Sequence, residues 1–207
     1  QEQLHSVLDT LSEREAGVIR IGYAVEPPYA FLAPNGEVTG ESPEIARRVV
    51  AGLAIPRIEW RQIEFGRLID ELEAGRIDVI AAGMFVTDER ARRVRFSAPT
   101  FHVRPGLLVA RGNPRGIRSY REAAAGNIRV AVLAGAVEEQ ILRRLGVAAA
   151  RLILVPDALT GRQAVESDLA DALMLSEPTV GWMAAQDGLG RTERVGAGAA
   201  SMNGNDS

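Results

Sequence analysis

The chain has 207 residues, which is enough for one large domain or for two small lobes. Its hydrophobic content of 46% is ordinary for a globular protein, and its net charge of −3 argues against nucleic acid or an anionic membrane as a partner. Cysteine is absent, which excludes disulfides and thiolate metal sites, and no apolar run approaches the ~18 residues needed for direct membrane insertion. The two histidines, His5 and His102, are far apart, so we expect no metal site and no cofactor.

The first half of the chain alternates patterns typical of strands and helices, which predicts an α/β lobe with a parallel sheet. Pro27-Pro28 disfavours both helix and sheet pairing and indicates a rigid loop, and Asn35-Gly36 indicates a tight turn. The expected elements are a helix in residues 1–16, a strand at 18–24, a helix from Ser42, a strand around Ile58 and Trp60, a helix from Leu68 to Gly75, and a strand at 79–82.

The helix after the tight turn is predicted in most detail. Ser42 is expected to cap it, with Pro43 in the first turn and Glu44 following, a typical order for a helix start. Ile45, together with Val49 and Leu53, is expected to form the apolar face of this helix.

The second half of the chain predicts another α/β lobe, without a repeat at the level of single residues. We place the first lobe at residues 1–108, the second at 109–196, and a flexible tail at 197–207, with a hinge in 104–114 around Gly112-Asn113-Pro114. The expected elements of the second lobe are strands 103–110, 128–133, 152–155 and 171–175, helices 137–145 and 178–185, and two helix starts with capping boxes, Ser119 with Glu122 and Thr160 with Gln163.

Residues 78–99 are the most informative about function. A short apolar run ends at Gly83, where a backbone can approach a ligand closely, and Phe85 follows at the end of the strand. Thr87 is expected to cap a helix. Arg90 in its first turn opposes the helix dipole, so helix stability does not explain it, whereas a guanidinium receptor for a carboxylate does. The alternative is an ordinary surface arginine, one of 24 basic residues.

This segment resembles the signature of the bacterial extracellular solute-binding proteins that serve polar amino acid ABC importers. Upstream, Glu26-Pro27-Pro28-Tyr29 resembles the loop after the first strand of that family, Asn35-Gly36 and Gly40 its hairpin, and Phe65-Gly66 its aromatic position before the second helix. The residues of the segment that fall on the signature are Asp78, Gly83, Met84, Thr87, Glu89, Arg90, Phe96, Ser97 and Pro99.

The resemblance implies a periplasmic-binding-protein-like α/β fold of two lobes, from which the C-terminal return segment is missing. It also implies an extracytoplasmic solute-binding protein that is not an enzyme and has no catalytic residues. The expected location is periplasmic or extracellular, including a lipid- or membrane-associated form. The expected partners are a small zwitterion and the permease of an ABC importer, and the protein is expected to be a monomer.

In open α/β sheets, ligands bind beyond the carboxyl ends of the strands, which in a two-lobe protein means a cleft between the lobes. The loops at those ends carry the candidate ligand-binding residues of both lobes. They are Glu26, Tyr29, Phe65, Phe85 and Arg90 in the first lobe, and Gly135, Ala136, Val137 and Ser176 in the second.

The candidate site departs from amino acid binders at two positions. Phe85 replaces the usual serine or threonine, and Ser176, beside Glu177, replaces the usual aspartate, so the α-ammonium group of an amino acid would lose two partners. An unpaired buried ammonium costs several kcal/mol. Separately, Ala136-Val137 replaces the usual Gly-Thr pair at a helix start, so a hydroxyl contact to the ligand carboxylate is lost, although backbone N–H groups remain.

The aromatic residues of the candidate site favour a different ligand. Tyr29, Phe65 and Phe85 offer ring faces to a delocalised cation, Glu26 can accept N–H donors, and Arg90 can hold a carboxylate. The pattern resembles the subgroup that binds ectoine and hydroxyectoine, which are zwitterionic compatible solutes. In that subgroup the aromatic residues form a cage and the arginine holds the carboxylate. The missing hydroxyl at the helix start of the second lobe is a departure from that subgroup.

Several alternatives remain at this stage. The chain can be a binder of polar or cationic amino acids, an enzyme similar to the periplasmic cyclohexadienyl dehydratases with Glu26 as general acid, or the sensor domain of a receptor. Tyr29, Phe65 and Phe85 can instead be core residues, and Glu26 a solvated loop residue. Glu138-Glu139 is expected to complement a helix dipole.

Overall fold

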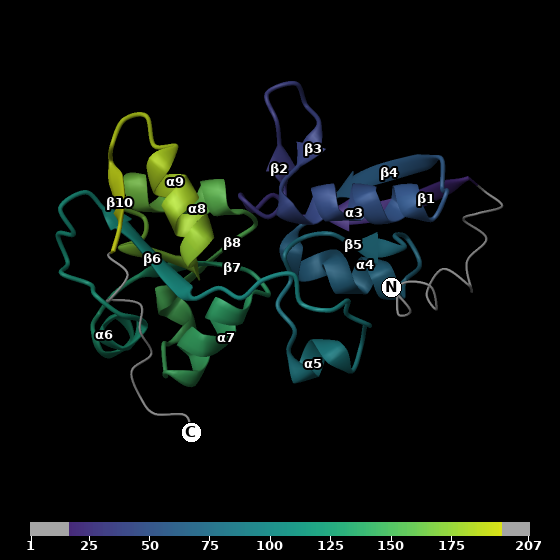
Figure 1. The fold of residues 1–207 in the computed structure, drawn as a ribbon. Coiled ribbons are helices and arrows are strands. Elements are labelled where there is room, and N and C mark those ends of the chain that lie inside the picture. Colours follow the sequence, from purple (N-terminus) through teal and green to yellow (C-terminus); the bar gives the residue numbers. More distant parts are fainter. Residues whose placement is uncertain (1–16, 196–207) are drawn as a thin grey trace. The chain divides into compact units, whose positions relative to one another are not determined.

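The computed structural model describes residues 17–195, which form two compact units, one ending at His102 and the other beginning at Val103 (Figure 1). The helix predicted in residues 1–16 and the tail predicted at 197–207 lie outside the described residues. Within the described part, no helix has both the length and the apolar character needed to cross a membrane. The α/β fold predicted from the sequence is confirmed. The hinge at 104–114 stays a prediction.

The first unit is built on a parallel sheet of three strands. β1 (Val18–Tyr23) lies in the centre, with β4 (Arg57–Gln62) on one side and β5 (Val79–Ile80) on the other. A separate hairpin of β2 (Phe31–Leu32) and β3 (Val38–Thr39) projects from this unit (Figure 1). Its tight turn is the predicted one, because Gly36 has a φ of 83° and Asn35 accepts a hydrogen bond from the Glu37 N–H at 3.1 Å.

Helices cover the two faces of this sheet. Ile19 and Ile21 of β1 form a core with α3 (Glu41–Gly52). Gly22 points to the opposite face, where an added Cβ would lie 3.3 Å from Leu68 in α4 (Leu68–Glu73). A 3₁₀ turn, η1 (Phe65–Arg67), precedes α4, and the single turn of α5 (Asp88–Ala91) follows β5.

The second unit has a mixed sheet of five strands in the order β10-β6-β9-β7-β8. The pairs β7–β8 and β7–β9 are parallel, whereas β6 runs antiparallel to β9, and β10, which was not predicted, runs antiparallel to β6. All partners of β6 lie in this unit, so the passage between the units precedes this strand. The strands are β6 (Pro105–Ala110), β7 (Val130–Leu133), β8 (Leu152–Val155), β9 (Ala172–Ser176) and β10 (Thr192–Arg194).

The helices of the second unit also cover both faces of its sheet. Val130 and Val132 of β7 form a core with Leu142 of α7, whereas Leu173 of β9 lies against Gly161 of α8. The elements between the strands are α6 (Tyr120–Ala125), α7 (Val137–Arg144), η2 (Ala149–Arg151), α8 (Ala158–Glu166) and α9 (Glu177–Ala185).

Two predicted helix starts are wrong. α3 is capped by Gly40 at a φ of 118°, not by Ser42, because the Ser42 hydroxyl instead accepts a hydrogen bond from the Gly83 N–H at 3.0 Å. Of the predicted apolar face, Val49 and Leu53 pack in the core together with Val50, whereas Ile45 is 39% exposed and was wrongly assigned to it.

α8 likewise begins earlier than predicted. Asp157 caps it by accepting from the Thr160 N–H at 2.7 Å, so Thr160 is not the cap. The cap predicted at Ser119 is confirmed, with a hydrogen bond of 3.1 Å from the Glu122 N–H. The Glu122 carboxylate accepts from the Arg118 N–H, one residue earlier than a capping box requires.

In each unit, one aspartate accepts hydrogen bonds from both the backbone and the side chain of one arginine, through the same three nitrogen atoms. We call this arrangement the aspartate–arginine clamp. Asp78 accepts from Arg20 at the backbone N, Nε and Nη2 at 2.8, 3.1 and 2.7 Å. Asp171 accepts from the same three atoms of Arg129 at 2.8, 3.3 and 3.0 Å. Each aspartate also donates its N–H to the carbonyl of its arginine at 2.8 Å. The two units therefore repeat at the level of single residues, contrary to the prediction.

The strand order repeats with the clamps. β4-β1-β5 in the first unit and β8-β7-β9 in the second are both parallel, and each clamp joins the centre strand to the strand that follows the second helix. The two clamp aspartates stand directly before β5 and β9, so these two strands and the loops that follow them occupy equivalent positions in their units.

We predict that replacing Asp171 with asparagine lowers the free energy of unfolding by about 1–3 kcal/mol, the usual cost of a charge-assisted hydrogen bond. Burial of Asp171 opposes ionisation, but the hydrogen bonds from Arg129 outweigh it and hold the pKa of this carboxyl below its usual value. The contribution is therefore complete above the pKa of the unfolded chain and is lost as the pH falls through the folded-state pKa.

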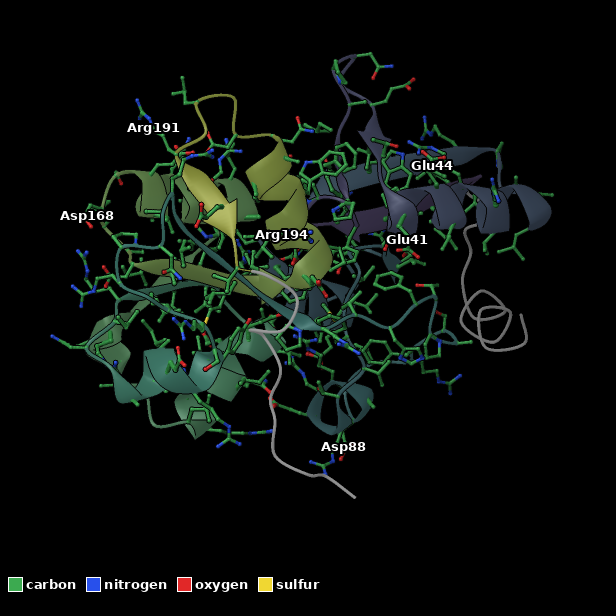
Figure 2. All side chains as sticks on the ribbon, turned by 60° about the vertical axis from the view of Figure 1, so that its left-hand side comes forward. Glu41, Glu44, Asp88, Asp168, Arg191 and Arg194 are labelled. Carbon is green, nitrogen blue, oxygen red and sulfur yellow. The ribbon has the colours of Figure 1, made fainter. Side chains whose placement is uncertain are left out.

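Urea unfolding of the wild type and Asp171→Asn between about pH 7 and pH 3 measures this difference, which should shrink at the acid end. Asp168→Asn is the control, because Asp168 bonds the same guanidinium but its side chain is 91% exposed and lies at the periphery of its unit (Figure 2). Equal effects of the two changes would contradict the clamp.

Candidate functional site

Arg90 is held at the start of α5 in the first unit. The Thr87 hydroxyl caps this helix by accepting from the Arg90 N–H at 3.2 Å, as predicted. Asp88 points outward from the same turn (Figure 2), whereas Arg90 is only 6% exposed. The helix therefore turns its acidic residue to solvent and its guanidinium inward.

Two predicted site residues contact this guanidinium. Arg90 Nη1 donates to the backbone carbonyl of Phe85 at 2.9 Å, and the guanidinium carbon lies 5.5 Å from the centre of the Phe65 ring. Phe65 is buried in η1, and Phe85 is partly exposed. The structure thus brings together three of the five predicted residues of this unit, and the guanidinium plane is fixed by a hydrogen bond and an aromatic face.

The other two predicted residues of the first unit lie in the loop after β1. Glu26 forms an isolated bridge with Ala30, and its carbonyl accepts from the Tyr29 N–H at 2.9 Å. Glu26 is 7% exposed, so the alternative of a solvated loop glutamate is wrong. Tyr29 is buried as well, which both the binding and the core interpretation predict.

Gly83 links the segment that leads to Arg90 with the loop that carries Tyr29. Its φ is +60°, and a Cβ on it would lie 2.6 Å from Cγ of Tyr29, so only glycine lets the end of β5 approach this ring. The Gly83 N–H donates to Ser42, and the Ser42 N–H donates to the Tyr29 carbonyl at 3.0 Å. The segment that begins at Gly83 continues through Phe85 to Arg90.

In the second unit, the candidate residues lie after β7 and β9. Gly135 is exposed, Ala136 caps α7 without a side-chain hydrogen bond, and Val137 begins the helix. Ser176 caps α9 and is 1% exposed, with its hydroxyl 3.3 Å from that of the buried Thr179. β7 and β9 are adjacent and parallel, which places both helix starts at the same edge of the sheet.

Three residues with notable contacts were not among the predicted site residues. Ser42 was assigned to a cap, and Phe101 had only its aromatic character as a signal; its ring stacks on Tyr29 with centres 5.2 Å apart. Glu138 was assigned with Glu139 to the helix dipole, yet Glu138 is 4% exposed. Burial and then the charge of Glu138 raise the pKa of Tyr120, whose hydroxyl donates to the carbonyl of Gly106 at 2.9 Å.

The candidate residues of the first unit include two buried groups that suit recognition of a small charged molecule, the guanidinium of Arg90 and the side chain of Glu26. The guanidinium lies against a backbone carbonyl and an aromatic ring, and the glutamate lies in the separate loop after β1. A guanidinium can bind an anion, and a glutamate can accept hydrogen bonds from a cation. Among residues 17–195, no three histidine, aspartate or glutamate side chains are arranged to hold a metal ion.

We compared the chain with models of known protein families, with known proteins and with solved structures. The model of the bacterial extracellular solute-binding proteins, family 3, matches residues 19–196. A relative from Sinorhizobium fredii, named a probable amino-acid ABC transporter periplasmic-binding protein, is 38% identical over 173 residues. The aligned region covers 82% of this chain and 57% of that protein, so the chain spans less than two thirds of its relative.

The fold is shared with solved structures of binding proteins. EhuB in complex with hydroxyectoine has a TM-score of 0.84 and 28% identity, over 94% of this chain and 74% of EhuB. An ancestral arginine-binding protein bound to glutamine has a TM-score of 0.80 and 26% identity, over 89% of this chain and 80% of that protein.

We predict that Gly83→Ala displaces the Tyr29 ring and lowers the stability of the first unit more than Gly75→Ala does. Both glycines have positive φ, so each alanine pays a backbone strain of about 1–2 kcal/mol. An added Cβ at Gly75 meets nothing within 4 Å, whereas at Gly83 it collides with Tyr29. Urea unfolding of both variants isolates the steric part, and equal losses would show that the approach of Gly83 to Tyr29 is not tight.

Proposed function

Because this chain belongs to family 3 of the bacterial extracellular solute-binding proteins, we propose that it binds a small zwitterion outside the cytoplasm and presents it to the permease of an ABC importer. The observation that carries the proposal is the buried guanidinium of Arg90, held between the Phe85 carbonyl and the Phe65 ring. A planar fork in that position suits the carboxylate that amino acids and ectoines share.

For the cationic part of the ligand, we propose an ectoine-type delocalised cation. Phe65 supplies a ring near the guanidinium, and Phe85 supplies a second ring in the segment whose backbone carbonyl Arg90 contacts. Each contact between a ring and a delocalised cation is worth about 0.5–2 kcal/mol. Glu26 supplies a buried negative charge in the loop that carries Tyr29. The fold shared with EhuB, which was solved with hydroxyectoine, supports this choice.

In the second unit, the absence of a carboxylate at position 176 supports the same ligand class. Ser176 stands where a carboxylate would pair with an α-ammonium group, and its hydroxyl already faces Thr179. Ala136 and Val137 offer no side-chain hydroxyl at the start of α7, which is a departure from the ectoine-binding subgroup as well, so this part of the site would contact a ligand through backbone N–H groups.

A polar or cationic amino acid is the second candidate ligand. It is favoured by the 38% identical relative, whose name describes amino acid import, and by the ancestral protein bound to glutamine. The same Arg90 would hold the α-carboxylate, and Glu26 would pair with the cationic group. Both candidates are ligands of a binding protein, and we propose no turnover: conversion of either ligand by the purified protein would favour an enzyme with Glu26 as general acid.

We predict that Arg90→Lys weakens binding of the ligand at least about tenfold, because a single ammonium cannot replace both the carboxylate fork and the bond to Phe85. Calorimetry against ectoine, hydroxyectoine, glycine betaine and a panel of amino acids gives the affinities. Arg92→Lys is the control, since Arg92 is exposed two residues further on. Unchanged affinity in Arg90→Lys, with the fold intact by circular dichroism, would remove Arg90 from the site.

A second prediction separates the two ligand classes. Phe85→Ser should weaken ectoine binding by roughly 1–2 kcal/mol, because a ring face and its apolar area are lost. Amino acid binding should suffer less or improve, since serine offers an acceptor to an ammonium group. The contact to Arg90 uses the backbone carbonyl of Phe85, so the substitution leaves that hydrogen bond in place. Tight amino acid binding by the wild type without ectoine binding would leave the amino acid alternative.

A further inference from the structure

Phe101 forms a ring stack with Tyr29 inside the first unit. The ring centres are 5.2 Å apart and the planes differ by 2°, which is an offset parallel stack. Tyr29 is 3% exposed, whereas Phe101 is partly exposed. Of the two stacked rings, the one that solutes can reach is therefore that of Phe101.

The remaining contacts of Tyr29 leave its ring little freedom. The backbone is fixed on both sides, by the hydrogen bond from its N–H to the Glu26 carbonyl and by the hydrogen bond from the Ser42 N–H to its own carbonyl. The base of the ring rests on Gly83, at a distance that excludes even a methyl group. Phe101 then covers a ring face, so the orientation of Tyr29 depends on Phe101 and Gly83 together.

The chain around Phe101 gives this ring no other evident role. Residues 95–104 contain neither helix nor strand, and the residues before and after Phe101, Thr100 and His102, are exposed. The contact in this irregular segment that we assign to Phe101 is therefore the parallel stack of its ring on the buried Tyr29 ring. The stack on Tyr29 places Phe101 beside the loop that carries Glu26 and Tyr29, two of the candidate site residues.

We propose that Phe101 determines ligand specificity as a fourth aromatic residue of the site: it fixes the plane of Tyr29 and presents its own outer face to the delocalised cation of the ligand. This rests on the proposed function of the site. A delocalised cation is attracted to the negative face of an aromatic ring, so an accessible face of Phe101 can add a contact to those of the other rings. A ligand with a neutral side chain gains less from that contact.

The test compares Phe101→Leu, Phe101→Tyr and Phe96→Leu by calorimetry with ectoine, L-arginine and L-glutamine as probes. Leucine keeps an apolar side chain but removes the ring face, so Phe101→Leu should weaken ectoine or arginine roughly threefold to tenfold and glutamine less. Phe101→Tyr should retain the wild-type preference. Phe96 is partly exposed in the same segment, so Phe96→Leu should leave all three affinities unchanged.

Three results would overturn the proposal. If Phe101→Leu lowers thermal stability while the ratios of the affinities stay as in the wild type, Phe101 only anchors its segment. If Phe101→Leu binds the probes more tightly, the ring occupies the place of the ligand. If the wild type binds none of the three probes, the proposed function is itself wrong for these ligands and the role of Phe101 in specificity fails with it.

Discussion

In both units, an aspartate directly before one strand fixes the position of that strand against the adjacent central strand. The geometry of the candidate site depends on this constraint. Asp78 holds the backbone and the side chain of Arg20 in the central strand β1, and Asp171 holds those of Arg129, the residue directly before the central strand β7. Once the starts of parallel strands are aligned, the positions of their opposite ends follow from strand length. Ser176 ends β9 and Gly83 follows the end of β5 by three residues, so the placement of both depends on contacts made at the starts of these strands.

The succession of strands and helices could be predicted because it depends on local apolar periodicity. Strand Leu152–Val155 matches its prediction, and the helix from Val137 differs by one residue at its end. Pairing was less accessible, since the antiparallel position of β6 beside β9 joins residues far apart in the chain. Cap positions failed where another group competed: Ser42 serves Gly83, 41 residues away, and Asp157 is a cap available three residues before Thr160.

The candidate site was predictable only where a motif points to it. The spacing from Gly83 to Arg90 identified a cation at a helix start, and the structure adds its partners, Phe85 and Phe65. No local pattern distinguishes Phe101 from any other aromatic residue, because its significance arises from a stack with Tyr29 across 72 positions of sequence. The same holds for Glu138, whose burial depends on the packing of α7 and not on its place in the first turn.

The brevity of α5 has a consequence for the energetics of binding. A helix of four residues is too short to be stable in isolation, so its order derives from the Thr87 cap and from the contacts of the Arg90 side chain. Local opening of this turn would withdraw the guanidinium from any ligand, and a ligand held by the guanidinium would oppose that opening by mass action. Ligand affinity and the folding equilibrium of one helical turn are thus thermodynamically linked, and part of the intrinsic binding free energy goes into keeping that turn formed.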